Sequence, residues 1–422
     1  MLLASSVFYI DALSGVMIAL ISFVGLVVSL FSRRYMKGDA NYYLFMALLI
    51  GLVSCLLLMV TANHFLLMLF AFGLSNLLLV RLMVHKKQWA ASAFAGLYAL
   101  RFFILGFICL AVSFWLLYWI TGSSTIQQAL NLVKPDNRLT LVALSLMLIS
   151  AMCQSAIWPF HRWLISSLNS PTPVSALMHA GLVNGGGFLL VRFAPLYLPH
   201  TSLLTIIFML GVGTALIGAL WKLIQNDIKR MLACSTASQM GFMFAQCGLG
   251  LFPAAVAHLC WHGLFKANLF LGSSGSIKPI ISDALPSRDW RILIASALFG
   301  LMGSYLFSWA SGLPWHSKNT LLFLIGIAFI ACTQFSLTLL HHFKWKNIIS
   351  TFFLTGMAGL LYGCSVRFIE AMISPLNLMV PQPMSIFHIV GFSLLTISWI
   401  AMLANDHLPT GNLIKRIKAA FY

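Results

Sequence analysis

Long apolar runs separated by short polar segments dominate the sequence. A membrane-spanning helix needs about 20 consecutive apolar residues, and this rule predicts thirteen spans. They cover residues 7–32, 42–60, 64–84, 91–120, 139–158, 174–196, 202–224, 231–251, 252–275, 291–312, 320–340, 349–371 and 386–404. The pattern predicts an all-α polytopic membrane protein. The first run lacks a basic leader and a small-residue cleavage site, so we do not expect a removable signal peptide.

Composition supports the same fold class. Of the 422 residues, 60% are hydrophobic and 8% are charged, whereas about a quarter of the residues in a soluble globular domain are charged. These values exclude a soluble enzyme, a disordered chain and a collagen-like fibre. The 8 cysteines lie scattered in apolar runs and form no Cys-x-x-Cys pair. Neither a disulfide framework nor a zinc knuckle is therefore expected.

Basic residues gather in one set of loops. The 25 Lys and Arg against 8 Asp and Glu give a net charge of +17, which in short loops indicates membrane orientation rather than a nucleic-acid surface. If the spans alternate, 18 basic residues fall on one side and 5 on the other, with Arg101 and Lys266 inside spans. The positive-inside rule then predicts an outside N-terminus and a cytoplasmic C-terminal tail around Lys415.

Two segments do not read as plain spans. Residues 155–173 contain Pro159, a polar His-Arg pair and a second proline cluster, and residues 184–187 read Asn-Gly-Gly-Gly. Proline inside a membrane helix frees backbone carbonyls that only buried protein or water can satisfy. Interrupted helices are where transporters tend to build ion sites, although a helix corner with a packing glycine explains the pattern equally well.

One predicted span contains three ionisable residues on a single face. His258, His262 and Lys266 stand at i, i+4 and i+8, and each step of four advances only about 40° around a helix. Lys266 lies about nine residues, roughly 14 Å of helical rise, from the cytoplasmic end. A charge at the bilayer centre costs about 3 kcal/mol or more. A lysine between two imidazoles predicts a proton relay, because imidazole titrates near neutral pH.

Other interpretations of these residues stay open. The three groups could simply hydrogen-bond to neighbouring helices, and His-x-x-x-His is also a zinc spacing, although no Cys or carboxylate is placed to complete a site. His179 is the next candidate for an ion pathway, but a lone histidine on an apolar helix is more often structural. Lys229, beside Asp227, belongs to a helix start that reads mainly as an interfacial anchor. No P-loop, dinucleotide fingerprint, nucleophile elbow or haem motif occurs, so neither covalent chemistry nor a cofactor is expected.

Several motifs closely resemble the antiporter-like subunits of respiratory complex I and of Mrp cation/proton antiporters. They are residues 158–164, residues 170–180, Asp227-Ile228-Lys229-Arg230 with 233–236, and His258, His262 and Lys266. Within that superfamily, residues 181–186, 239–243, 246–250 and 273–276, together with 11–14 and 33–39, resemble the DabB subunits of DAB inorganic-carbon uptake complexes. The resemblance covers residues 7–280 and is most specific from 154 to 276.

The resemblance implies a fold of 13 to 14 helices with two inverted five-helix repeats. These repeats are expected at 42–196 and 202–340, after an N-terminal helix at 7–32 and before C-terminal helices in 341–422. It also implies a multi-pass protein of the bacterial inner membrane with a soluble DabA-like partner similar to a zinc β-carbonic anhydrase. In that family the membrane subunit is thought to pass H⁺ or Na⁺ to drive CO₂ hydration by the partner.

The first repeat departs from the family pattern. Gln154 stands where the family has a lysine, and the acid expected after Arg101 is absent. No Asp or Glu occurs between Asp39 and Asp136, and no Lys occurs between Lys134 and Lys222. The first repeat therefore cannot hold the usual Glu–Lys pair. The second keeps its two histidines and its lysine, and a later acid, Glu370, stands near the outer end of its span.

Three functions are consistent with these observations: a DabB-like conducting subunit, a non-conducting membrane anchor for the same partner, and a complex I or Mrp-type antiporter module. The missing pairs and the unmatched C-terminal part weaken the third. The polar stretch from Lys278 to Arg291, with the 159–172 turn, is expected to contact the partner. Trp290 and Arg291 are the candidate docking residues, because Trp and Arg are enriched at the energetic centres of interfaces.

Overall fold

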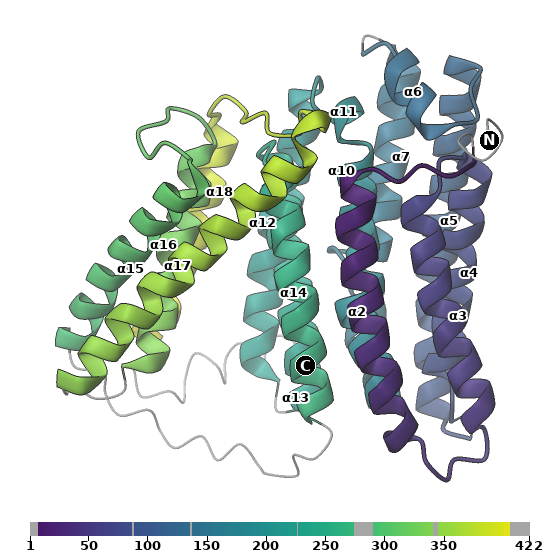
Figure 1. Cartoon of the computed structure of the whole chain (residues 1–422), viewed down its shortest axis with the longest axis horizontal. Helices are drawn as coiled ribbons and strands as arrows, with labels where there is room; N and C mark the ends of the chain where they lie inside the picture. Colours follow the sequence, from purple (N-terminus) through teal and green to yellow (C-terminus); the bar gives the residue numbers. More distant parts are fainter. Residues whose placement is uncertain are drawn as a thin grey trace. The chain divides into compact units, whose positions relative to one another are not determined.

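The computed structural model describes residues 7–86, 88–135, 137–225, 227–273, 290–340 and 345–405. The described residues form helices joined by short loops, and none of them belongs to a β-strand (Figure 1). The predicted all-α fold is confirmed. The chain divides into two compact units, one made of residues 1–248 and 258–276 and the other of residues 249–257 and 277–422.

The first unit holds the longer series of helices. They are α2 (Ala12–Tyr35), α3 (Tyr42–Thr61), α4 (Phe65–Met83), α5 (Ala90–Thr121), α6 (Ile126–Leu132), α7 (Arg138–Gln154), α8 (Arg162–Ile165), η1 (Ser167–Asn169), α9 (Thr172–Ala180), η2 (Leu182–Asn184), α10 (Gly185–Arg192), α11 (Ala194–Tyr197), α12 (Thr201–Ile224), α13 (Ile228–Gly248) and most of α14 (Phe252–Gly272). The second unit holds α15 (Trp290–Ser311), α16 (Leu321–Leu339), α17 (Trp345–Ile373), η4 (Ser374–Leu376) and α18 (Ile386–Asn405).

Every predicted span contains helix, but the count of thirteen is not confirmed. Within the described residues, 10 helical stretches are long and apolar enough to cross a membrane. Helix α7 has only 17 residues, and α13 and α14, with 21 residues each, lie outside this set. These two helices are less apolar because they contain the lysines, histidines and hydroxyls of the candidate pathway. The two predicted inverted repeats stay a prediction.

Several predicted boundaries differ from the structure. The first helix begins at Ala12, where the Asp11 side chain accepts a hydrogen bond from Ser14 N and caps it. The 91–120 run forms one unbroken helix of 32 residues. Helix α7 ends at Gln154, four residues early, because Ala156 adopts a left-handed backbone with φ +53°.

The predicted 174–196 span is not continuous. Helix α9 ends at Ala180, the 3-10 turn η2 follows, and α10 begins at Gly185, so the break precedes the Gly-Gly-Gly motif. The stretch Thr172–Arg192 is 94% buried inside the protein, against at most 50% for the other spans. A broken helix can cross a membrane only where protein or water satisfies its freed backbone groups. Its burial explains how the interruption is tolerated.

Small residues let α12 and α13 pack with their backbones nearly touching. A Cβ atom added at Gly218 would lie 2.7 Å from Ser238 N, and the Ser238 hydroxyl donates a hydrogen bond of 2.9 Å to Ala215 O. A Cβ at Gly211 would likewise meet the backbone of Ala245. Close contact through small residues is the usual way that membrane helices associate. It fixes α13, which carries Lys229 and Thr236, against the rest of the first unit.

The second unit is held by hydroxyl bonds and a looped-back segment. Ser336 Oγ and Thr355 Oγ1 lie 2.8 Å apart between α16 and α17. Val380 N donates to Gly250 O over 3.1 Å, and the Thr320 hydroxyl donates to Leu249 O over 2.8 Å. Residues 249–251, just before α14, are thereby fixed within this unit.

Candidate functional site

The broken helix places His179 in the interior of the first unit. This side chain is 1% exposed, and its ring stacks on Phe270 of α14 with centroids 4.3 Å apart. Its Nδ1 lies 3.1 Å from Thr236 Oγ1 on α13. Because the Thr236 hydroxyl donates to Leu232 O over 3.0 Å, its oxygen is left to accept from His179 Nδ1–H. That assignment fixes the tautomer of the neutral imidazole.

Lys266 also hydrogen-bonds to the Leu232 carbonyl. Its side chain is 1% exposed, and Nζ donates a hydrogen bond of 3.1 Å to Leu232 O. Leu232 O therefore accepts from both Lys266 and Thr236. One carbonyl on α13 joins the lysine of α14 to the histidine of α9 through a continuous chain of hydrogen bonds.

The two histidines of α14 follow one another at one-turn spacing on the helix that carries Lys266. The His258 and His262 rings have centroids 6.1 Å apart and planes inclined by 24°. His262 is 5% exposed and hydrogen-bonds to the backbone of His179. Its Nε2 is buried without a hydrogen-bond partner among the residues that the structure describes. An imidazole with one unsatisfied nitrogen can accept or release a proton there.

Lys229 lies on the face of α13 that carries the other groups. Positions 229, 232 and 236 follow the spacing i, i+3 and i+7, which repeats on one side of a helix. Lys229 Nζ donates to Ser170 O, 3.1 Å away in the turn before α9. Asp227 accepts from Arg230 N over 2.9 Å, so the expected acidic cap of this helix is present.

The described carboxylates of the first unit, Asp11, Asp39 and Asp227, are engaged elsewhere. Asp11 pairs with Arg192 at 2.6 Å, and Asp39 lies 3.1 Å from His85 Nε2. With Asp227 capping α13, none of the described acids of this unit forms an ion pair with Lys266. An uncompensated buried charge costs several kcal/mol, so Lys266 sits where gain or loss of a proton strongly changes the local energy.

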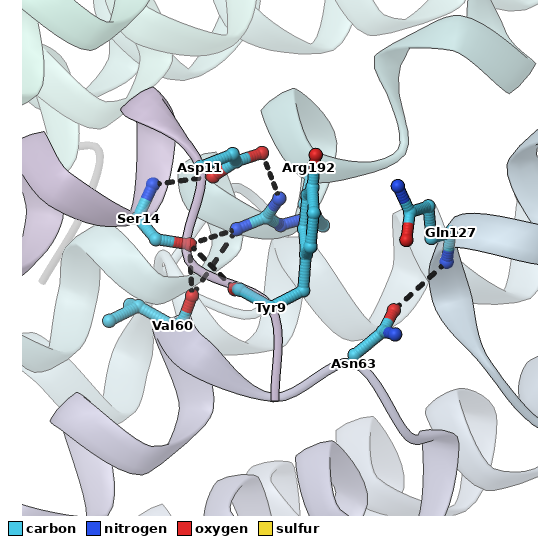
Figure 2. A network of polar contacts seen from close by, with 7 residues as sticks. All are labelled: Tyr9, Asp11, Ser14, Val60, Asn63, Gln127 and Arg192. Atoms are coloured by element: carbon cyan, nitrogen blue, oxygen red, sulfur yellow. Dashed lines mark hydrogen bonds and ion pairs between the residues drawn. The ribbon is translucent and has the colours of Figure 1, made fainter. Parts of the chain in front are cut away.

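Arg192 ties the C-terminal end of α10 to α2 and α3. Its guanidinium donates to Asp11 Oδ2, to Ser14 Oγ over 2.6 Å and to Val60 O over 3.2 Å (Figure 2). Beside it, Asn63 Oδ1 accepts from Gln127 N over 3.1 Å. This network holds α10, and with it the segment that positions His179.

Gln154 belongs to a neutral polar cluster. Its Oε1 accepts from Asn76 Nδ2 over 3.1 Å, and its Nε2 donates to Leu182 O over 3.3 Å. Both side chains are at most 3% exposed. The position where the family has a lysine is thus filled by an amide with an amide partner.

Trp290 and Arg291 belong to the second unit. Trp290 is 65% exposed at the start of α15, and the Arg291 guanidinium lies 5.7 Å from its ring centroid. Residues 278–289 of the predicted docking stretch, and the tail around Lys415, lie outside the described residues.

The tertiary contacts reveal participants that the sequence did not single out. Thr236 and the Leu232 carbonyl join two predicted residues, yet neither carries a charge that would attract attention in an apolar run. Asn76 is visible as a polar residue inside a span, which is the one signal that could have found it. Among the described residues no group of three or more His, Cys, Asp or Glu side chains could hold a metal ion.

Comparison with known proteins finds two matching families and several similar proteins. Residues 62–282 match the family described as NADH:quinone oxidoreductase/Mrp antiporter, TM, and residues 3–46 match the complex I chain 5 N-terminus family. The chain is 32% identical over 407 residues to a protein named "Probable inorganic carbon transporter subunit DabB1" from Halothiobacillus neapolitanus, covering 93% of this chain and 68% of that protein. It is 36% identical over 296 residues to a probable DabB from Bacillus anthracis, covering 68% of this chain and 57% of that protein.

A solved structure shares the fold. An Mrp complex from Dietzia sp. superposes with a TM-score of 0.67 at 23% identity, over 96% of this chain and 49% of the matched chain. The present chain thus spans about half to two thirds of the length of the relatives it matches.

Proposed function

Because the chain belongs to the DabB family of inorganic carbon transporter subunits, within the complex I and Mrp antiporter superfamily, we propose that it conducts an ion for inorganic-carbon uptake. The membrane of a bacterial cell is its proposed location, with the N-terminus outside and the C-terminus cytoplasmic. The proposed pathway contains Lys266, His258, His262, His179 and Lys229.

The observation that supports conduction most is the buried chain joining His179, Thr236, the Leu232 carbonyl and Lys266. If these groups were only structural, each of their buried polar atoms should have a hydrogen-bond partner. Here His262 keeps a buried nitrogen without a partner among the described residues. The Leu232 carbonyl accepts at both ends and cannot pass a proton itself, so it holds the groups in place. Protons would move between the nitrogen bases, from Lys266 to this Nε2 of His262, by small side-chain movements.

The chemistry of the chain favours H⁺ over Na⁺. Hard cations are held by oxygen ligands, usually with carboxylates among them. Its titratable groups are nitrogen bases, and the described acids of the first unit are bound to Arg192, to His85 or to the start of α13. A proton can pass between imidazoles and an amine, whereas Na⁺ would find few oxygens to replace its hydration shell.

The partner we propose is a soluble subunit resembling a zinc carbonic anhydrase, which would perform any catalysis. The resemblance to DabB subunits supports it, and Trp290 with Arg291 offers an exposed aromatic and cationic anchor. Replacing both residues with Ala should reduce recovery of the partner on co-purification at least threefold. The control is Trp345→Ala, which removes a tryptophan of α17 that is even more exposed than Trp290. Equal recovery in both variants would move docking elsewhere.

The alternative function is a non-conducting anchor for the same partner. One observation favours it: Gln154 stands where the resemblance expects a lysine, and it pairs with Asn76 through neutral amides. A lapsed pathway in the first half of the chain would leave conduction to the second half alone or abolish it.

Lys266→Met distinguishes the two functions. Methionine keeps a similar unbranched length and removes the titratable group, so packing should change little. We expect normal expression and partner recovery but at least tenfold lower uptake of labelled inorganic carbon. Lys346→Met, at an exposed lysine of α17, is the control and should transport normally. Uptake at the parental rate by Lys266→Met would refute conduction through this lysine and support the anchor.

A further inference from the structure

A cationic cavity lies in the first unit at the ends of several helices. It has a volume of about 460 Å³, within the range of small-molecule sites. Its walls come from the end of α2, the α2–α3 loop, the α4–α5 loop, the turn before α9 and the start of α13. No part of the chemistry proposed above uses this cavity, except that Lys229 borders it.

The lining carries an excess of positive charge. Lys37, Lys86 and Lys229 contribute three ammonium groups, whereas Asp39 is the one carboxylate among the described lining residues. Asp39 is already engaged, since His85 Nε2 lies 3.1 Å from Oδ2 and Asn41 N donates to Oδ1 over 2.8 Å. These bonds hold the pKa of the Asp39 carboxyl below its ordinary value, the backbone bond from Asn41 first and the His85 contact second.

The three lysines form no ion pair with a carboxylate within 4.0 Å among the described residues. Lys229 donates to Ser170 O, which leaves further N–H groups to point elsewhere. Lys86 Nζ lies 4.9 Å from the Trp89 ring centroid, a contact that positions an ammonium without neutralising it.

A neutral donor completes the set. The Thr172 hydroxyl donates to the Tyr35 hydroxyl over 3.4 Å. The Tyr35 proton is therefore left for an acceptor elsewhere, and this side chain lines the cavity. Several convergent donors with a net positive charge in a cavity of this size make a site for an acceptor-only, negatively charged group.

We propose that this cavity binds an oxyanion, either the phosphate of an anionic lipid headgroup or a free phosphate or bicarbonate ion. Trp89 is 52% exposed at its rim. An amphipathic ring beside a lysine at the end of a membrane helix suits the lipid headgroup region, so we expect the lipid to bind more tightly. This inference does not depend on ion conduction.

Lysine acetylation read by mass spectrometry tests the site in the unmodified full chain. The delipidated protein in neutral detergent is acetylated in the presence of sodium phosphate, sodium bicarbonate or sodium chloride at equal ionic strength. In parallel, the protein is labelled in nanodiscs of phosphatidylcholine with and without phosphatidylglycerol. We expect at least threefold slower labelling of Lys37 and Lys86 when the oxyanion is present, and unchanged labelling of the exposed Lys222 and Lys346.

The arms separate the two sources. Protection by soluble phosphate or bicarbonate in detergent identifies a free-ion site, and protection only by phosphatidylglycerol identifies a lipid site. Equal labelling of Lys37 and Lys86 in all conditions would overturn the proposal.

A variant gives an independent measurement. Lys37→Gln with Lys86→Gln should weaken binding of the protective oxyanion at least tenfold, measured by its thermal stabilisation of the purified protein. The matched control, Lys222→Gln with Lys346→Gln, removes the same charge outside the cavity and should keep the affinity. If the cavity variant does not fold, the labelling result on the unmodified chain still decides. Equal affinity in the two folded variants would also refute the site.

Discussion

The Arg192–Asp11 pair offers the sharpest test of how the broken helix is held. Both side chains are 8% exposed. Arg192→Met removes the guanidinium and leaves Asp11 as a largely buried charge, while Ser14 Oγ and Val60 O lose a charged donor. Removing one partner of a buried pair costs about 3 to 5 kcal/mol. We expect about 3 kcal/mol here, because the pair sits near the end of a span.

The assay is thermal unfolding of the full chain in detergent, followed by size-exclusion chromatography. With about 2 °C per kcal/mol for a chain of this size class, Arg192→Met should lower the melting temperature by about 6 °C. Arg101→Met is the control. Arg101 is exposed on α5, so its loss should cost less than about 0.5 kcal/mol.

A double-mutant cycle separates the pair from the rest of the network. Asp11→Asn keeps an acceptor for Ser14 N, and thus the cap of α2, but removes the charge. Added to Arg192→Met, it should cost about 2 kcal/mol less than the sum of the single changes, since the buried carboxylate no longer lacks its partner. Additive losses, or an Arg192→Met protein as stable as the Arg101→Met control, would refute the reasoning.

The same pair predicts a pH dependence. Burial by itself would raise the pKa of the Asp11 carboxyl, but the Arg192 charge and the hydrogen bonds from Ser14 and Arg192 lower it overall. Because the pKa of Asp11 is lower in the folded state, the carboxylate stabilises the fold fully at pH values above the ordinary pKa of 3.8. This stabilisation is lost as the pH falls from 3.8 through the lower pKa of the folded state. In Arg192→Met the buried Asp11 carboxylate has lost its counter-charge, so it takes up a proton at a higher pH than in the parent. The difference in stability between the parent and Arg192→Met should therefore be largest at pH 7, shrink as the pH falls, and be smallest below 3.8.

Two further substitutions probe the packing and the neutral cluster. Gly218→Val should push α12 away from α13, because the valine side chain would meet the backbone of Ser238, and should lower the melting temperature by at least about 2 °C. The control is Gly213→Val, where an added Cβ would have nothing within 4 Å. Equal melting temperatures for the two variants would contradict this packing. Gln154→Lys should lower the yield of folded protein without adding transport, because Asn76 cannot neutralise a buried ammonium; a gain in carbon uptake would show that the first half-pathway can be restored.

The sequence by itself determined the class of the protein and most of its helix positions. A run of about 20 apolar residues is a local property, and lipid leaves an isolated run few alternatives to a helix. The shared face of His258, His262 and Lys266 also followed from helical spacing alone. The family followed from the motifs around Pro159, His179 and the second of these helices, and the comparisons confirm it.

The tertiary structure alone decided which groups meet. His179, the Leu232 carbonyl and Lys266 come from three helices, and Asp11 and Arg192 are 181 residues apart. In lipid, hydrophobicity does not select helix partners, so small residues and hydrogen bonds choose them. The sequence does not show whether a hydroxyl or a backbone carbonyl bonds only within its own helix or also to a neighbouring helix. For that reason Thr236 and Leu232 became part of the candidate site only when the helices were packed.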